Sequence, residues 1–159
     1  MKIRVGFGYD VHRLEPGYLF WLGGIKVEHS KGSVGHSDGD VLIHAICDAL
    51  LGAAGLRDIG VYFPDNDPAL KGIDSKILLR KTVEILTEKG FSIGNIDSTI
   101  CLEKPKIKAN IPLMQQTLAD VMGIDTSDIS IKATTTETLG FTGREEGVSA
   151  YAVVLVEKS

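Results

Sequence analysis

Two hydrophobic periodicities alternate along the chain. Runs rich in β-branched and aromatic residues, bounded by Gly, Pro, Asn and Asp, predict strands at residues 3–10, 95–103, 128–135 and 148–158, and a short hairpin at residues 18–27 that turns at Gly23-Gly24. Apolar residues repeating at helical spacing predict helices at residues 39–54, 74–89 and 110–122. Because helices and strands interleave in the second half, we expect an α/β (α+β) sandwich in which helices pack on one face of a mixed β-sheet.

Length and composition narrow the possible functions. The 159 residues contain no repeat, low-complexity tract or linker, so we expect one domain over residues 1–159. A net charge of −4 argues against a nucleic-acid or anionic-membrane binder. The longest apolar run, residues 41–56, is interrupted by His44 and Asp48, so no segment is expected to cross a membrane. Cys47 and Cys101 lack zinc or redox spacing, which indicates free thiols in a reducing compartment such as the cytoplasm.

The helix predicted at residues 39–54 carries an unusual polar stripe. Its apolar residues wrap most of the circumference, which is typical of a buried helix. Asp40, His44 and Asp48 follow one another at i, i+4 and i+8, so they share one line on that helix. Buried ionisable groups must be paired, hydrogen-bonded or metal-bound. Either a His44–Asp48 hydrogen bond satisfies the histidine, or His44 serves a metal site.

A metal site at His44 needs further ligands, and the first predicted strand contains two candidates. In "GYDVH", residues 8–12, Asp10 and His12 stand two positions apart and therefore project from the same face of a strand. One carboxylate and two imidazoles suit zinc or a similar divalent ion. Three protein ligands leave a position for water or substrate, which is typical of a working site. His36 and Ser37, in the loop before the striped helix, could face a phosphate at its N-terminus.

A second polar segment, "IKATTTETLGFTGREEG", spans residues 131–147. Its threonine hydroxyls and backbone amides could hold phosphate oxygens, Glu137 could hold Mg²⁺, and Arg144 could bind a phosphate through two hydrogen bonds. The plain alternative is a Thr-rich strand followed by a flexible loop. Neither a P-loop nor a complete dinucleotide-binding fingerprint is present in the sequence.

Taken together, the motifs resemble one family over the whole chain. The segments "GYDVHRL", "HSDGDVLIHAICDALLGAAGLRDIG", "FPDNDP", "KPKI" and "ATTTETLGFTGR" are similar to the 2-C-methyl-D-erythritol 2,4-cyclodiphosphate synthases, the cyclases of non-mevalonate isoprenoid biosynthesis. One departure is visible, because Phe7 stands where the family commonly has histidine. That position is not a metal ligand in the family, so the departure concerns local packing.

The resemblance implies the cofactors and the erythritol side of a substrate site. It implies that Asp10, His12 and His44 bind zinc, and that Glu137 helps to hold a second divalent cation, Mg²⁺ or Mn²⁺. His36 and Ser37 would face the erythritol phosphate. The further implied residues on this side are Asp58 and Gly60, which would hold the erythritol hydroxyls, and a loop with Phe63, Asp65 and Asp67 that would close over the substrate.

The resemblance also implies which residues bind the cytidine end of the substrate. Residues 102–108 would bind cytosine through backbone groups, and Thr134 and Thr135 would hold the diphosphate. The implied residues of this side are Leu102, Lys106, Ile107, Lys108, Thr134, Thr135, Glu137, Phe141 and Arg144, with Asp10 and His12 also counted among the substrate contacts. His36 and Thr135 are the implied catalytic residues.

The implied reaction converts 4-diphosphocytidyl-2-C-methyl-D-erythritol 2-phosphate, a small cytidine diphosphate ester, to the cyclic 2,4-diphosphate and CMP. The implied assembly is a bacterial cytoplasmic homotrimer whose active sites lie between neighbouring subunits. Two alternatives remain compatible with the three-ligand set, namely a zinc-dependent phosphohydrolase and a non-catalytic module that a metal stabilises.

Overall fold

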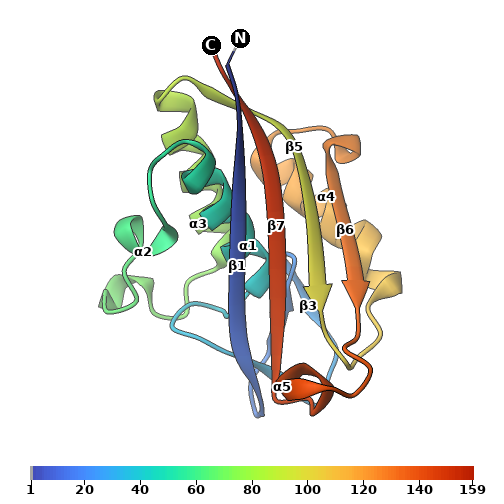
Figure 1. Cartoon of the computed structure of the whole chain (residues 1–159). Helices are drawn as coiled ribbons and strands as arrows, with labels where there is room; N and C mark the ends of the chain where they lie inside the picture. The colour runs from blue at the N-terminus through green and yellow to red at the C-terminus, as the bar shows by residue number, and fades with distance from the viewer. Residues whose placement is uncertain (1) are drawn as a thin grey trace.

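The computed structural model describes residues 2–159 and contains a five-stranded mixed sheet (Figure 1). The strand order is β4-β1-β7-β5-β6. Its strands are β1 (Lys2–Pro16), β4 (Lys31–Val34), β5 (Phe91–Cys101), β6 (Ile129–Thr134) and β7 (Gly147–Lys158). The pair β5–β6 is parallel, and the other neighbours are antiparallel. The predicted hairpin forms a separate small sheet from β2 (Phe20–Leu22) and β3 (Ile25–Val27). The mixed sheet that the sequence predicts is therefore confirmed.

Three long helices cover one face of this sheet (Figure 1). They are α1 (Val41–Ala53), α3 (Ser75–Glu88) and α4 (Ile111–Met122), all within one or two residues of the predicted bounds. The shorter elements are the helices α2 (Ile59–Tyr62) and α5 (Gly140–Gly143) and the 3₁₀ turns η1 (Pro68–Leu70), η2 (Lys108–Asn110) and η3 (Thr126–Asp128). Helix α1 packs against β1 and β7 and is buried almost all round, as its apolar circumference predicts.

The structure differs from the strand prediction in the lengths of β1 and β5 and in the edge strand β4, which was not predicted. Strand β1 continues beyond residue 10 to Pro16, because β7 and then the unpredicted edge strand β4 pair with its second half. Strand β5 begins at Phe91 rather than at residue 95, with an irregularity between Ile93 and Asn95. These extensions depend on a partner strand distant in the sequence, so a local pattern does not reveal them.

Two glycines of β1 let α1 lie directly on the sheet. A Cβ atom built on Gly6 would lie 1.9 Å from the carbonyl oxygen of Ala49, and one on Gly8 would lie 1.9 Å from that of Ala45. Both contacts are with helix backbone, which cannot move aside without shifting the whole helix. The absence of two side chains therefore sets the separation between β1 and α1, the elements that carry Asp10, His12 and His44.

Over β1 and β7, the opposite face of the sheet is apolar and exposed. Strand β1 alternates between glycine or polar residues toward the helices and large apolar residues outward. Val5 is 65% exposed and Phe7 is 62% exposed. We call this surface the open face, and its large side chains are Ile3, Val5, Phe7, Tyr9 and Val11 of β1 and Tyr151 and Val153 of β7. Phe7 thus points away from the side that carries Asp10 and His12. Within residues 2–159 no helix is long and apolar enough to span a membrane.

The close approach of α1 to β1 yields a test with a matched control. We expect Gly8→Ala to lower the free energy of unfolding by more than about 3 kcal/mol, because the added methyl group overlaps helix backbone. Gly52→Ala adds the same methyl group within α1, where no atom outside the adjoining helix backbone lies within 4 Å, and should stabilise by up to about 1 kcal/mol through helix propensity. Urea unfolding measures both. Equal stability of the two variants would contradict the packing argument.

Candidate functional site

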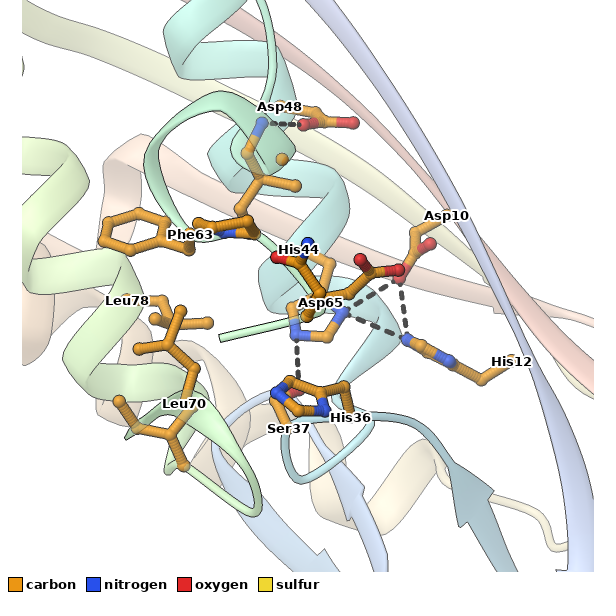
Figure 2. Close-up of a pocket in the computed structure, with 15 residues that line it drawn as sticks. Asp10, His12, His36, Ser37, His44, Asp48, Phe63, Asp65, Leu70 and Leu78 are labelled. Carbon is orange, nitrogen blue, oxygen red and sulfur yellow. Dashed lines mark hydrogen bonds and ion pairs between the residues drawn. The ribbon is translucent and has the colours of Figure 1, made fainter. Parts of the chain in front are cut away.

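A pocket of about 480 Å³ opens where β1, α1, α2 and the loop before α3 meet (Figure 2). Figure 2 shows Asp10, His12 and His44 on one side of it and Phe63, Leu70 and Leu78 on the other. The lining residues are Asp10, His12, His36, Ser37, His44, Asp48, Ile59, Gly60, Phe63, Pro64, Asp65, Asn66, Leu70, Ile73 and Leu78. A polar cluster beside an apolar wall is typical of small-molecule sites.

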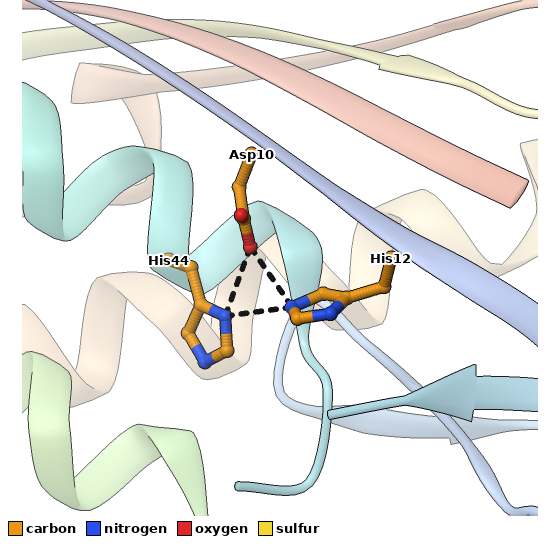
Figure 3. A group of neighbouring side chains, drawn as sticks. All are labelled: Asp10, His12 and His44. Carbon is orange, nitrogen blue, oxygen red and sulfur yellow. Dashed lines mark hydrogen bonds and ion pairs between the residues drawn. The ribbon is translucent and has the colours of Figure 1, made fainter. Parts of the chain in front are cut away.

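The three predicted ligands meet in this pocket (Figure 3). Asp10 Oδ2 lies 2.9 Å from His12 Nε2 and 3.0 Å from His44 Nδ1, and the two nitrogens are 3.0 Å apart. The alternative His44–Asp48 hydrogen bond is wrong. Asp48 Oδ1 instead accepts a hydrogen bond of 2.8 Å from the Ile59 backbone amide, which fastens α2 to α1.

Electrostatics at this cluster favour positive charge. Burial alone would raise the pKa of Asp10, but hydrogen bonds from His12 and His44 outweigh burial and lower it. Burial would lower the pKa of His12, yet the Asp10 carboxylate raises it. The half-buried carboxylate thus stays ionised and attracts a proton or a metal cation to the same point.

The chemistry of the donor set fits a divalent metal. His12 Nδ1 lies 3.0 Å from the carbonyl oxygen of Val34, which can only accept, so Nδ1 carries a proton and Nε2, which points at Asp10, is the nitrogen that a cation would use. Ligand atoms of a tetrahedral zinc site lie about 3.3 Å apart, close to the separations found here. Asp10, His12 and His44 would hold such an ion, and a set of three protein ligands leaves room for water or substrate.

The loop that carries His36 and Ser37 is joined to the segment that lines the opposite wall. His36 Nε2 donates to the carbonyl oxygen of Asp67 at 2.8 Å, and the Gly72 amide donates to that of His36 at 2.7 Å. Ser37 Oγ lies 3.1 Å from His44 Nε2. Of the predicted erythritol-side residues, Asp58 and Asp67 do not line the pocket, because their carboxylates cap α2 and η1.

The predicted cytidine-side residues do not reach this pocket. Asp10 pairs with Ala150 of β7, which pairs with Ile100 of β5, which pairs with Ala133 of β6. Three strand spacings, about 14 Å, therefore separate the triad from the threonine segment. The residues outside the pocket are Leu102, Lys106, Ile107, Lys108, Thr134, Thr135, Glu137, Phe141 and Arg144. Within one chain, Glu137 does not join the Asp10–His12–His44 cluster.

These distant residues form a second polar group of their own. The Leu102 amide donates to the carbonyl oxygen of Thr134 at 2.9 Å. The carboxylate of Glu103, for which the sequence predicted no role, accepts from the backbone amides of Thr136 at 3.1 Å and Thr138 at 3.0 Å. The loop after β5 therefore holds the threonine loop, and only the parallel pairing of β5 with β6 brings the two together.

The apolar wall was also missed by the sequence reasoning. Leu70, Ile73 and Leu78 line the pocket from the segment leading into α3. Leu78 belongs to the buried stripe of that helix, so its apolar character indicated a core residue and nothing more. Its place in the pocket depends on how the preceding loop folds back onto His36.

The fold and the site define an α/β protein with a candidate divalent-metal centre beside a ligand pocket. A model of the YgbB family matches residues 3–157, and the chain belongs to this family. The 2-C-methyl-D-erythritol 2,4-cyclodiphosphate synthase of Bacteroides thetaiotaomicron is 70% identical over 99% of both chains. The synthase of Porphyromonas gingivalis is 65% identical over 96% of this chain and 94% of its own.

Solved structures agree with the sequence relatives. A 2C-methyl-D-erythritol-2,4-cyclodiphosphate synthase with bound CDP superposes with a TM-score of 0.89 at 35% identity, covering 97% of this chain and all of the other. The bifunctional IspDF of Campylobacter jejuni gives a TM-score of 0.95 at 40% identity, covering 99% of this chain and 43% of that longer protein. The resemblance deduced from the motifs is thereby confirmed.

The triad geometry predicts that metal binding depends on His44. We expect His44→Ala to lose stoichiometric zinc while remaining folded, because the change removes one of three ligands and leaves the α1 packing intact. Elemental analysis after loading and gel filtration measures the zinc, and circular dichroism checks the fold. His29→Ala, on the loop between β3 and β4 outside the pocket, is the control and should keep its zinc. One zinc per chain in purified His44→Ala would overturn the assignment.

Proposed function

We propose that this chain is a cyclodiphosphate synthase, which converts 4-diphosphocytidyl-2-C-methyl-D-erythritol 2-phosphate to 2-C-methyl-D-erythritol 2,4-cyclodiphosphate and CMP. The observation that carries the proposal is the Asp10–His12–His44 triad at the rim of the pocket, in a chain 70% identical to a curated synthase. The whole chain acts as one catalytic domain. The reaction belongs to non-mevalonate isoprenoid biosynthesis, and we propose the bacterial cytoplasm as its location, supported by the free thiols of Cys47 and Cys101.

The reaction requires charge compensation more than acid–base chemistry. The 2-phosphate attacks the β-phosphorus of the same molecule, the bond from that phosphorus to the CMP oxygen breaks, and the ring closes. The attacking phosphate is already ionised near neutral pH, so no general base is needed. The difficulty is that two anionic groups must approach each other in a protein of net charge −4.

Cations and oriented donors offset that repulsion. Asp10, His12 and His44 would hold zinc, and Glu137 would help to hold a second divalent cation, Mg²⁺ or Mn²⁺. When bound, these ions supply a template and Lewis acidity for the phosphoryl oxygens. The lowered pKa of Asp10 supports this use, as does the hydrogen bond from His12 Nδ1 to Val34, which leaves Nε2 for a cation.

The chain's own donors position the erythritol end of the substrate. We assign His36 and Ser37 to the 2-phosphate, supported by their place in the pocket wall beside the triad. Asp58 and Gly60 would hold the hydroxyl groups. Residues 63–67, including Phe63, Asp65 and Asp67, would close over the substrate, and Phe63 and Asp65 already line the cavity.

The threonine segment and the loop after β5 would bind the cytidine end. Thr134 and Thr135 would hold the diphosphate, and Thr135 would stabilise charge on the phosphorus as the leaving group departs. Backbone groups of Leu102, Lys106, Ile107 and Lys108 would bind cytosine. Phe141 and Arg144 would lie beyond the threonines, where Arg144 already pairs with Glu146 at 3.0 Å.

A homotrimer with shared active sites explains why these two halves lie apart in one chain. About 14 Å of sheet separates the triad from the threonine segment, which is too far for both to contact the same diphosphate group. The open face offers the apolar surface that an obligate assembly buries, with large side chains on β1 and β7. A cyclic arrangement would place the triad of one subunit beside the threonine segment of its neighbour.

Product analysis tests the proposed reaction. Incubation of the zinc- and magnesium-loaded protein with the cytidylated erythritol 2-phosphate should release CMP and the cyclic diphosphate in equal amounts, measured by mass spectrometry. His29→Ala should match the wild type, and His44→Ala should form neither product. A zinc phosphohydrolase would instead release inorganic phosphate, and a metal-stabilised module would leave the substrate intact and unfold on chelation. Either result would overturn the synthase.

Complementation between two inactive variants tests the shared site. His44→Ala damages the triad and Thr135→Ala damages the threonine segment. If the site lies between subunits, co-refolding equal amounts should restore activity toward about a quarter of the wild-type interfaces, because those pair an intact triad with an intact segment. Each variant refolded alone is the control. Mixed trimers confirmed by mass analysis but as inactive as their parents would place the site within one chain.

A further inference from the structure

Behind His44, on the side away from the triad, lies a hydrogen-bonded pair, Ser75 and Asp38, that does not line the pocket. Ser75, the first residue of α3, is fully buried, and its Oγ lies 2.9 Å from His44 Nε2. The same Oγ lies 2.5 Å from Asp38 Oδ1, and the Ser75 amide donates to Asp38 Oδ2 at 2.9 Å. Neither residue lines the pocket, so neither can bind the substrate there.

The direction of each hydrogen bond follows from the donors available. The Asp38 carboxylate can only accept, and the Ser75 hydroxyl has one proton to give. That proton goes to Asp38 Oδ1, so Ser75 Oγ must accept from His44. His44 Nε2 therefore carries a proton, and Nδ1, which lies 3.0 Å from Asp10 Oδ2, is the nitrogen that a cation would use.

We propose that Ser75 and Asp38 are positioning residues, which hold His44 in the Nε2–H tautomer and direct its Nδ1 lone pair into the cation site. The proposal rests on the metal centre of the proposed function and extends it to residues outside the pocket. The backbone carbonyl of Val34 holds the Nδ1 proton of His12 in the same way. Both imidazoles thus have their protons held on the far side of the ring.

A second serine near His44 does not determine the tautomer. Ser37 Oγ also lies near His44 Nε2, at 3.1 Å, but it faces the pocket. No carboxylate accepts its proton within the part of the chain that is described, so this hydroxyl can either donate or accept. Only Ser75, with its proton held by Asp38, forces His44 to donate.

The same carboxylate also fixes where the ring stands. Asp38 Oδ1 accepts from the Asp40 amide at 3.1 Å, and the Asp38 amide donates to the carbonyl oxygen of Ile73 at 3.1 Å. The start of α3 is therefore fastened to the loop that enters α1, one turn before His44. Ser75 stays within reach of the imidazole because these backbone contacts hold both helix starts together.

The experiment reads the tautomer and the metal affinity separately. In zinc-loaded protein with ¹⁵N-labelled histidine, two-bond ¹H–¹⁵N spectra should show a protonated Nε2 for His44, with Nδ1 on the metal. Ser75→Ala should lose this preference and raise the zinc dissociation constant about 10- to 100-fold, measured against a chromophoric chelator. Ser98→Ala, which removes another buried serine hydroxyl that bonds only Ser130 on the sheet, should change neither reading. Ser37→Ala should keep the tautomer.

The other outcomes would overturn either the positioning role or the metal centre. A protonated Nδ1 in the wild type would overturn the positioning role, and this reading stands even if Ser75→Ala fails to fold. A folded Ser75→Ala with the tautomer and zinc affinity of Ser98→Ala would also overturn it. A wild-type protein that binds no zinc would instead overturn the metal centre itself, and with it the positioning role that rests on it.

Discussion

The backbone-to-backbone contact between β1 and α1 is the constraint on which the site depends. Gly6 and Gly8 leave no side chain between the strand and the helix, and the facing positions of α1, Ala45 and Ala49, are small as well. The interior is packed so closely that a single methyl group at this contact would have to displace the helix. Because Asp10 follows Gly8 by two residues on the same face and His44 precedes Ala45, the same contact sets the distance between the metal-binding side chains.

Buried carboxylates organise the polar layer around this contact. Asp40 is fully buried, and burial together with the nearby Asp38 raises its pKa, while amides of Gly23, Gly24 and Ile43 donate to it. It joins the β2–β3 turn to the start of α1. Asp38 joins that start to α3, and Asp48 joins α1 to α2. Asp38, Asp40 and Asp48 thus each accept hydrogen bonds that join separate segments. Asp10 is the carboxylate of the triad, and it faces the cavity.

The open face and the divided site are two consequences of one topology. Strands β7 and β5 separate β1 from β6, so a chain that places its triad on β1 and its threonines after β6 cannot bring them together. The outward residues of β1 remain apolar where solvent alone would favour polar ones. A neighbouring subunit on this face would resolve both features, which is why the assembly belongs to the proposed mechanism.

The sequence by itself determined the elements, the triad and the family. Helical spacing predicted α1, α3 and α4, because periodicity is a local property, and the i+2 spacing placed Asp10 and His12 on one face. The motif set was specific enough to identify the relatives.

The hydrogen-bond partners of His44 were decided only by the tertiary structure. Asp48 bonds to Ile59 instead, and Ser75, 31 residues away from His44, becomes the partner of Nε2. Such contacts depend on how loops fold back over a packed helix, and sequence spacing carries no information about that path. The same reason explains why the sequence did not predict three further features. These are the length of β1, the edge strand β4 and the role of Glu103, each of which requires a partner that only the folded sheet brings near.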